Sequence, residues 1–183
     1  EQPDDIRHLG NGPTPSGVLV LGKHEDALLQ ALEGWEAPVA LVDDRDYFTR
    51  HPTSRLHDVS IDDARLGELA AEHLLALGHQ RLVLLFGTLE ASSVHRERLC
   101  GVRRALGRHG LNLDSDWIIE TDVTLAGAAA VQDRLRQQLE QGATAILAMA
   151  DILAIGCFKQ LLALGYRVPE QVSLLGIDNL QIL

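Results

Sequence analysis

Six short apolar runs recur along the chain, and each is continuous rather than alternating with polar residues. Runs of this kind suit strands that are covered on both faces, as in a parallel sheet. Amphipathic segments separate the runs, so strand and helix alternate. This alternation predicts right-handed βαβ crossovers and an α/β fold with an open, doubly wound parallel sheet. The runs are Val18–Leu21, Val39–Val42, Leu82–Phe86, Trp117–Glu120, Ala145–Met149 and Val172–Ile177.

Capping residues and glycines mark the helices between these runs. Downstream of the N-cap, either Asp62 or Asp63, the apolar residues follow a 3.6-residue period that stops at Gly78. A further helix, capped by Thr124, is expected to run unbroken to Gly142. Other helices are expected to end near Gly34, Gly110 and Gly165.

The interval between Asp43 and Asp62 breaks the alternation. It is polar, contains a proline, ends in a short β-like run at His57–Ser60, and is expected to hold no helix. We interpret it as a loop and a strand that cross between two lobes, spanning residues 1–60 and 61–183. The first lobe then has few strands for a sheet covered on both faces, so we expect part of this lobe to be missing.

The net charge excludes nucleic-acid binding by this stretch alone. The 183 residues include 16 basic and 26 acidic side chains, which gives a formal charge of −10 and a pI of about 5.1. Such a surface repels phosphate backbones, so any contact with DNA must come from elsewhere. The chain lacks an initiator methionine and ends abruptly, and we therefore expect it to be a fragment of a longer protein.

The sequence also indicates where the protein resides. No apolar run approaches the roughly 20 residues of a membrane helix, and the first residues lack a signal-peptide pattern. Cys100 and Cys157 lie far apart, which fits neither a disulfide framework nor a zinc site and suits a reducing compartment. We expect a soluble, cytoplasmic protein with no membrane partner.

Motifs for catalysis are absent. The string from Gly17 to His24 is one residue short of a phosphate-binding Walker A motif, but the residues between its glycines are the body of a strand. The sequence lacks a serine nucleophile elbow, a dinucleotide fingerprint and a zinc-protease helix. His73 and His79 lack the spacing of a metal pair, and the acidic cluster at 43–46 suits a solvated loop. We therefore expect no enzyme activity, cofactor or metal.

Polar side chains gather where the expected strands end. In open α/β sheets, ligands bind outside the carboxyl ends of the strands. Carboxylates, hydroxyls and a guanidinium around one crevice suit a small polyhydroxylated ligand, because they bond hydroxyl groups directionally. The candidate binding residues are Asp43, Ser92, Ser93, Arg98, Asp151 and Asp178, with Asp122 and Thr124 after a further strand.

Ordinary structural roles compete with this interpretation. Asp43 also suits a turn, and for Asp151 we favour a role as a helix N-cap over a binding role. For Arg98 and Asp178 the pattern alone leaves both a structural role and a binding role open.

Several strings, in this order, resemble the regulatory domain of the LacI/GalR family of bacterial repressors. They are Leu77-Gly78-His79-Gln80-Arg81, Arg98-Leu99-Cys100-Gly101-Val102, and Val168-Pro169-Glu170-Gln171-Val172-Ser173-Leu174-Leu175-Gly176-Ile177-Asp178. The resemblance covers roughly residues 17–183. It implies a type I periplasmic-binding-protein-like fold of two lobes with doubly wound sheets, the first lobe incomplete in this chain.

The resemblance also implies a function and a site. A small carbohydrate effector would bind between the lobes of a homodimer and control operator DNA binding by an N-terminal headpiece that is absent here. The family's effector-binding arginine falls on Arg98, its effector-binding aspartate on Asp178, and a strand-end acid on Asp43. Where many relatives have asparagine, this chain has Ala150, so one sugar-contacting amide is missing.

Two other functions compete with the regulator. A periplasmic sugar-binding protein of a transporter would have a signal peptide before residue 1, whereas a repressor would have a basic helix-turn-helix there. An enzyme with a flavodoxin-like sheet would need a nucleophile beside a base, or a metal cluster, and no local motif supplies either.

Overall fold

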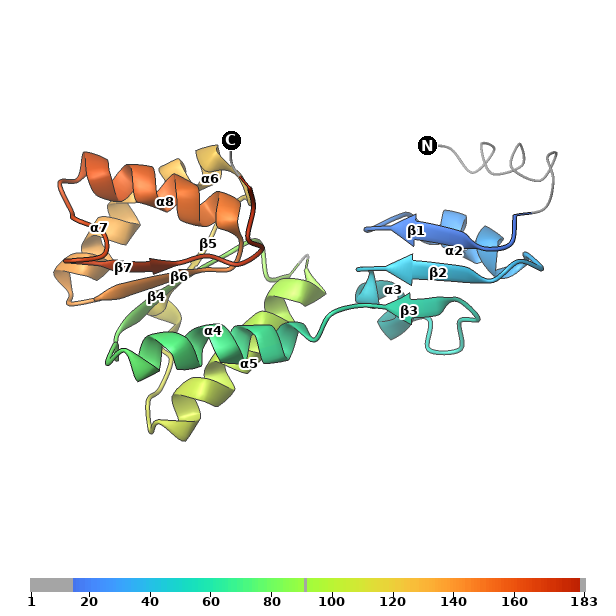
Figure 1. Ribbon diagram of the computed structural model, residues 1–183, viewed down its shortest axis with the longest axis horizontal. Coiled ribbons are helices and arrows are strands. Elements are labelled where there is room, and N and C mark those ends of the chain that lie inside the picture. The colour runs from blue at the N-terminus through green and yellow to red at the C-terminus, as the bar shows by residue number, and fades with distance from the viewer. Residues whose placement is uncertain (1–14, 91, 182–183) are drawn as a thin grey trace. The chain divides into compact units, whose positions relative to one another are not determined.

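The computed structural model describes residues 15–90 and 92–181 of the chain. Clustering of its contacts divides the chain into two compact units, one ending at Ile61 and the other beginning at Asp62 (Figure 1). In the described residues, no helix has both the length and the apolar character needed to cross a membrane. Each unit is an α/β structure with its own parallel sheet.

The first unit is built on a parallel sheet in the order β1 (Val18–Leu21), β2 (Val39–Val42) and β3 (His57–Val59). Two helices, α2 (Asp26–Glu33) and α3 (Arg45–Arg50), supply buried side chains to the same small core as β1 and β2. Its buried members are Val20, Leu29, Leu32, Val39, Leu41, Tyr47 and Leu56.

The other face of this sheet is open among the described residues. Leu19 and Leu21 on β1 are 73% and 69% exposed, and Val59 on β3 is 50% exposed. Leu21, Val42 and Val59 are neighbours in register across the three strands, so their side chains line one apolar face. A parallel sheet normally has both faces covered, whereas the helices of residues 15–61 pack on a single face of this one.

The second unit holds a larger parallel sheet in the order β5 (Ile118–Glu120), β4 (Leu82–Phe86), β6 (Ala145–Ala148) and β7 (Ser173–Leu175). Every residue of β4 and β6 is buried. These two strands are therefore buried on both faces, as their continuous apolar runs predicted.

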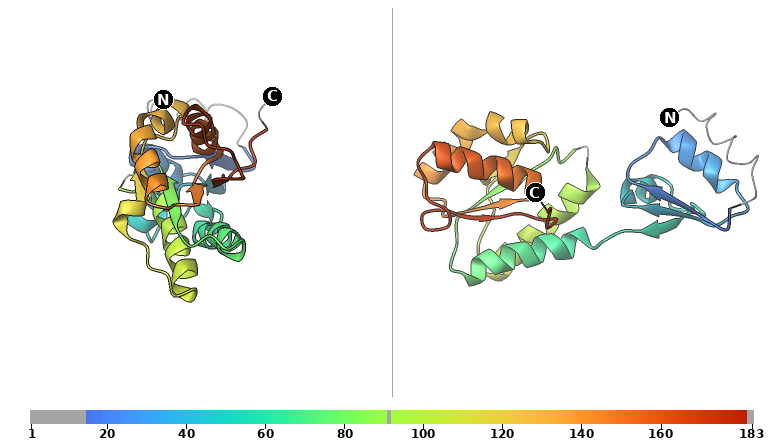
Figure 2. Two further views of the ribbon diagram at one scale, coloured as in Figure 1. Left: turned by 90° about the vertical axis from the view of Figure 1, so that its left-hand side faces the viewer. Right: turned by 45° about the horizontal axis from the view of Figure 1, so that its top comes forward.

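Helices cover both faces of this second sheet. Helices α4 (Asp63–Ala76) and α5 (Ser93–Arg108) pack on one face, while α6 (Leu125–Ala130), α7 (Gln132–Glu140) and α8 (Asp151–Ala163) pack on the other (Figures 1 and 2). Alternate residues of β4 and β6 enter the two separate hydrophobic cores. This doubly wound, three-layer arrangement confirms the predicted fold class for the second unit.

The helix boundaries read from capping residues are confirmed in two places. The side chain of Asp62 accepts a hydrogen bond from the backbone N–H of Arg65, and that of Thr124 accepts one from Gly127. Gly78 ends the first of these helices with φ at +92°, a conformation in which a side chain would be strained. Local capping chemistry was therefore readable from the sequence.

Helix α3 is a correction to the expectation that the interval after Asp43 holds no helix. Asp44 caps α3 by accepting a hydrogen bond from the backbone N–H of Tyr47. Tyr47 is fully buried and packs edge-on against Phe48. The expectation failed because two aromatic residues, rather than a repeating apolar stripe, anchor this short helix.

The helix expected from Thr124 to Gly142 is in fact two helices. Val131 separates α6 from α7 with φ at −100° and ψ at 11°, which lies outside the helical range. Ala128 on α6 and Leu135 on α7 still pack in the same core, as the period of the sequence predicted.

The strands are also shorter than their apolar runs. Trp117 lies in a 3₁₀ turn, Ser115–Trp117, and β6 and β7 end before Met149 and Ile177. At Met149 and Ile177 the chain has left its strand, although both side chains stay buried in the core.

Candidate functional site

The carboxyl edge of the second sheet gathers most of the candidate residues predicted from the sequence. Ser92 and Arg98 lie on the helix that follows β4, Asp151 begins the helix after β6, and Asp178 follows β7. All four belong to the second unit. Because the strands are parallel, their carboxyl ends form one edge, and the residues that follow them converge there.

Arg98 is held at this edge by two hydrogen bonds. Its side chain is buried, its Nε donates to Oδ1 of Asp63 over 2.9 Å, and its Nη1 donates to the carbonyl oxygen of Met149 over 2.5 Å. A charge withdrawn from water is tolerated only when it is paired and hydrogen-bonded. Asp63 and Met149 therefore fix the guanidinium in a single orientation beside the end of β6.

Two glycines allow Asp63 to reach Arg98. A Cβ on Gly101 would overlap the carbonyl oxygen of Ala64, and a Cβ on Gly67 would overlap the carbonyl oxygen of Arg98. Helices α4 and α5 can therefore approach backbone to backbone only because both positions lack a side chain. The sequence places Asp63 far from Arg98, and this close helix contact makes them partners.

His95 is a further candidate at this edge, and the sequence analysis did not nominate it. It lies one helical turn before Arg98, is 9% exposed, and packs edge-on against the ring of Phe86 with centroids 6.0 Å apart. Within the described part of the chain its Nδ1 has no hydrogen-bond partner. Burial, together with the positive charge of Arg98, lowers its pKa, so the ring is neutral near pH 7.

The i, i+3 spacing from Arg98 was the signal that could have identified His95, because residues three apart share a helix face.

The backbone directly after β4 packs closely against His95. A Cβ on Gly87 would lie 2.7 Å from Nε2 of His95 and 2.6 Å from Cγ2 of Val123. His95 and the loop after β5 therefore meet over a position where only glycine fits.

The two serines occupy the start of α5. Ser92 is the N-cap, and its hydroxyl accepts a hydrogen bond from the backbone N–H of His95. Ser93 is the first residue of the helix, and both serines are half-buried. The structure gives Ser92 a capping role and leaves its binding role, and that of Ser93, as predictions.

Asp151 is not the N-cap that we favoured. Ala150 occupies that position, with no side chain able to cap, and Asp151 lies in the first turn of α8. Oδ2 of Asp151 instead accepts a hydrogen bond from the backbone N–H of Leu180 over 2.7 Å, and its own N–H donates to the carbonyl oxygen of Ile177. The carboxylate thus binds the segment that follows β7.

Asp178 lies in this segment and is exposed, with φ at 120°. Asn179 next to it has φ at 55°, so two successive residues other than glycine adopt positive φ. The turn presents the Asp178 carboxylate to solvent at the carboxyl edge of the sheet.

Asp43 is the candidate residue that lies in the first unit and not in the second. It is exposed and has φ at 61°, and its N–H donates to the carbonyl oxygen of Val59. The turn role that we considered for it matches this backbone geometry. Its binding role stays a prediction.

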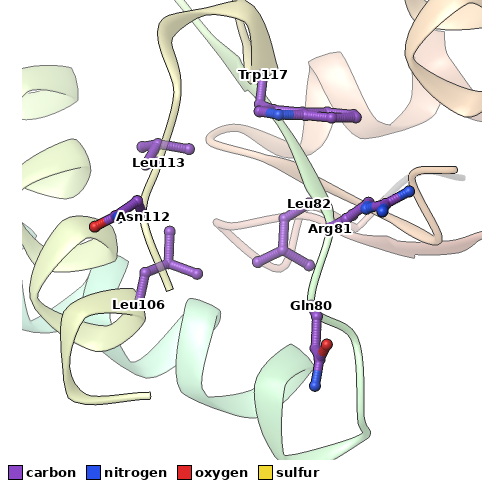
Figure 3. A pocket seen from close by; sticks show the side chains of 7 residues that line it. All are labelled: Gln80, Arg81, Leu82, Leu106, Asn112, Leu113 and Trp117. Atoms are coloured by element: carbon purple, nitrogen blue, oxygen red, sulfur yellow. The ribbon is translucent and has the colours of Figure 1, made fainter. Parts of the chain in front are cut away.

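A hollow of about 220 Å³ lies near the opposite, amino edge of the second sheet (Figure 3). The start of β4 and the residue before β5 form part of its wall, and Arg81 donates a hydrogen bond to the carbonyl oxygen of Gln141. None of the candidate binding residues lines it. The lining residues are Gln80, Arg81, Leu82, Leu106, Asn112, Leu113 and Trp117.

In residues 15–90 and 92–181, no group of three or more histidine, cysteine, aspartate or glutamate side chains could hold a metal ion. Burial raises the pKa of the Cys157 thiol to about 12, so this cysteine stays protonated and unreactive. The described residues at the carboxyl edge supply hydrogen-bonding and charged groups.

Comparison with known proteins gives consistent similarities. The family profile of periplasmic binding protein-like domains matches residues 71–183. A transcriptional repressor named PurR from Aliivibrio salmonicida is 31% identical over 169 residues, covering 91% of this chain and 48% of the relative. The regulator AscG from Escherichia coli is 37% identical over 128 residues, covering 69% of this chain and 37% of the relative. The chain thus spans half or less of the length of these two relatives.

Solved structures give the same picture. The Escherichia coli repressor AscG has a TM-score of 0.76 at 27% identity, with 97% of this chain and 62% of that chain covered. A complex of the regulator CelR with cellobiose has a TM-score of 0.75 at 26% identity, covering 97% of this chain and 53% of that chain. A LacI-family protein from Chloroflexus aggregans has a TM-score of 0.83 at 23% identity, which supports the fold alone.

Proposed function

Because the chain belongs to the LacI/GalR family, as part of its periplasmic-binding-protein-like regulatory domain, we propose that it senses a small carbohydrate for a transcriptional repressor. The carbohydrate binds at the carboxyl edge of the second sheet and changes the affinity of a DNA-binding headpiece for its operator. The observation that carries the proposal is the buried guanidinium of Arg98, fixed by Asp63 and Met149 beside the end of β6.

The side chains at this edge match the chemistry of a polyhydroxylated ligand. Arg98 supplies N–H donors, Asp178 supplies carboxylate oxygens, and a neutral His95 both donates and accepts. A sugar hydroxyl also donates and accepts, so it satisfies all three. The cellobiose bound by the structurally similar regulator CelR supports a saccharide as the class of ligand. Ser92, Ser93 and Asp43 are further candidate contacts.

The mechanism is a shift between two states and involves no reaction. A ligand changes the equilibrium between two arrangements of the lobes only by binding one of them more tightly. We propose that the protein works as a cytoplasmic homodimer, and that the two headpieces bind the operator in only one arrangement. The formal charge of −10 on this stretch leaves DNA binding to the headpiece.

The similar proteins support a regulator over the alternatives. PurR and AscG are named as transcriptional regulators, and neither name describes a transport receptor or an enzyme. No reaction is therefore proposed for this chain.

Titration calorimetry with glucose, galactose, ribose and cellobiose tests the proposal. We expect one of these sugars to bind, and Arg98→Lys to weaken its binding about tenfold or more, because lysine keeps the charge but loses the planar fork of donors. Arg136→Lys on the exposed side of α7 is the matched control and should leave the affinity unchanged. Circular dichroism checks that each variant is folded.

The outcomes separate the parts of the proposal. A folded protein that binds none of the four sugars would contradict a carbohydrate of this kind as the effector. Equal affinity in the wild type and in Arg98→Lys would remove Arg98 from the site.

A further inference from the structure

The turn after β7 contains two residues whose backbone conformations must be held by neighbouring parts of the protein. Asp178 and Asn179 have φ at 120° and 55°, in a region that residues with a side chain rarely adopt. Such conformations persist only where the surrounding structure fixes them. Both residues are exposed, so core packing of their own side chains does not supply this support.

Asp151 supplies it from the neighbouring helix. Its Oδ2 accepts the backbone N–H of Leu180 over 2.7 Å, and its backbone N–H donates to the carbonyl oxygen of Ile177 over 2.7 Å. These two bonds hold the turn on either side of Asp178 and Asn179. A charge-assisted hydrogen bond to a carboxylate is stronger than a neutral one, so Leu180 is held firmly.

The other oxygen of Asp151 faces the same turn. A Cβ on Gly176 would overlap Oδ1 of Asp151 and lie 3.0 Å from Cβ of Ala154. Gly176 thus lets the backbone after β7 lie directly against the carboxylate. Oδ2 is therefore engaged by Leu180 while Oδ1 lies against Gly176, so the carboxylate packs on residues 176–180.

We propose that Asp151 is a positioning residue, which holds the turn of Asp178 by accepting the Leu180 N–H and does not itself contact the effector. This extends our proposed function, because it takes Asp178 as the residue that binds the effector. It also replaces the earlier assignment of Asp151 to the set of binding residues.

The residues between β6 and α8 that lead into Asp151 also hold Arg98. Met149 lies two residues before Asp151, and its carbonyl oxygen accepts the hydrogen bond from Nη1 of Arg98. The backbone N–H of Met149 donates to the carbonyl oxygen of Leu85 on β4. Residues 149–151 therefore fix both the arginine and the Asp178 turn relative to the sheet. The distance between these two charged groups is set by this short segment.

A measurement without ligand tests the positioning role. In Asp151→Ala, NMR should show the Leu180 amide exchanging with solvent about tenfold or more faster, with the Asp178 and Asn179 resonances shifting as the turn relaxes. Asp151→Asn should show a smaller change, because an amide oxygen still accepts the bond. Asp133→Ala is the control, since it removes an exposed acid from the first turn of α7 and should leave the turn unchanged.

Unchanged Leu180 exchange in a folded Asp151→Ala would overturn the proposal. So would equal acceleration in Asp133→Ala, which would trace the effect to the loss of a charge at a helix amino end. Where the alanine variant does not fold, Asp151→Asn replaces it. Faster Leu180 exchange than in the wild type supports the proposal, because the bond to an amide oxygen lacks charge assistance, and exchange at the wild-type rate overturns it.

A second measurement uses whichever of glucose, galactose, ribose and cellobiose binds the wild type. Asp151→Ala and Asp178→Ala should each weaken binding by about tenfold, and the double variant should be about as weak as Asp178→Ala alone, because one residue acts through the other. Additive losses would show that Asp151 contacts the sugar itself and would overturn the proposal. If no sugar binds, the proposed function fails while the exchange data still decide the role of Asp151.

Discussion

The two units follow the same alternation of strand and helix, yet their sheets are covered differently. In the second unit every residue of β4 is buried between two helical layers. In the first unit α2 and α3 lie on one face, and Leu19 and Leu21 on the other face are 73% and 69% exposed. A continuous apolar run therefore predicts a strand that suits burial on both faces. Whether both faces are in fact covered depends on other parts of the chain.

One ion pair from each unit illustrates a related difference. Arg98 and Asp63 of the second unit are both buried. Asp26 of the first unit pairs with Arg50 and His51 at the surface, and mainly the hydrogen bond from Arg50 lowers its pKa to about 2. Water screens the attraction between the two charges of the surface pair, so the loss of one partner costs little free energy. In the buried pair, no water can replace a lost partner, so the remaining charge is left uncompensated.

The largest expected effect comes from breaking the buried pair. Asp63→Ala should lower the free energy of unfolding by about 3–5 kcal/mol, because it leaves the Arg98 charge buried without its counter-ion. Asp26→Ala should have a much smaller effect, since Asp26 is at the surface. Urea unfolding followed by tryptophan fluorescence measures each unit separately in variants that keep only Trp117 of the second unit or only Trp35 of the first. Similar losses from the two variants would contradict the comparison.

Two leucines on strands sharpen the comparison of the sheets. Leu84→Ala on β4 should lower the free energy of unfolding by about 2–5 kcal/mol, since the side chain is fully buried and leaves a cavity. Leu19→Ala on β1 should change it by less than about 0.5 kcal/mol in this chain. The same urea experiment measures both. A large loss from Leu19→Ala would show that something covers the open face in solution.

A smaller effect should appear in the pH dependence. The pKa of His95 is lowered, chiefly by burial and then by Arg98, so the folded second unit binds fewer protons than the unfolded chain. Its stability should therefore fall as the pH drops through about 6.5, the ordinary histidine value. The Asp26 pair of the first unit contributes down to a lower pH and is lost only as the pH falls from 3.8 toward about 2.

Urea midpoints read from Trp117 between about pH 7.5 and 5.5 measure this contribution. His95→Asn should flatten the profile of the second unit. A profile that is equally steep in the wild type and in the variant would assign the effect to other groups.

Local chemistry was predictable from the sequence, and long-range pairing was not. The fold class and the N-caps Asp62 and Thr124 depend on patterns within a few residues, so they could be read directly. Arg98 and Asp178 could be nominated because parallel strands bring their ends to one edge.

The partners of these residues could not be nominated. Asp63 lies 35 residues from Arg98, and Leu180 lies 29 residues from Asp151, so each contact depends on how the helices and strands pack. Asp151 is instructive, because its position matched a helix N-cap while its oxygens bind another segment. A strand-end acid can therefore be identified from the sequence, but its task depends on which backbone lies opposite.

The glycine contacts between α4 and α5 have a mechanical consequence. With backbone atoms touching at Gly67 and Gly101, the two helices have no side-chain layer in which to slide. They form one closely packed pair, in which α4 begins at Asp63 near the start of the second unit and α5 carries Arg98 in its second turn. The guanidinium of Arg98 is therefore tied to α4 by the backbone contact of the two helices as well as by its bond to Asp63.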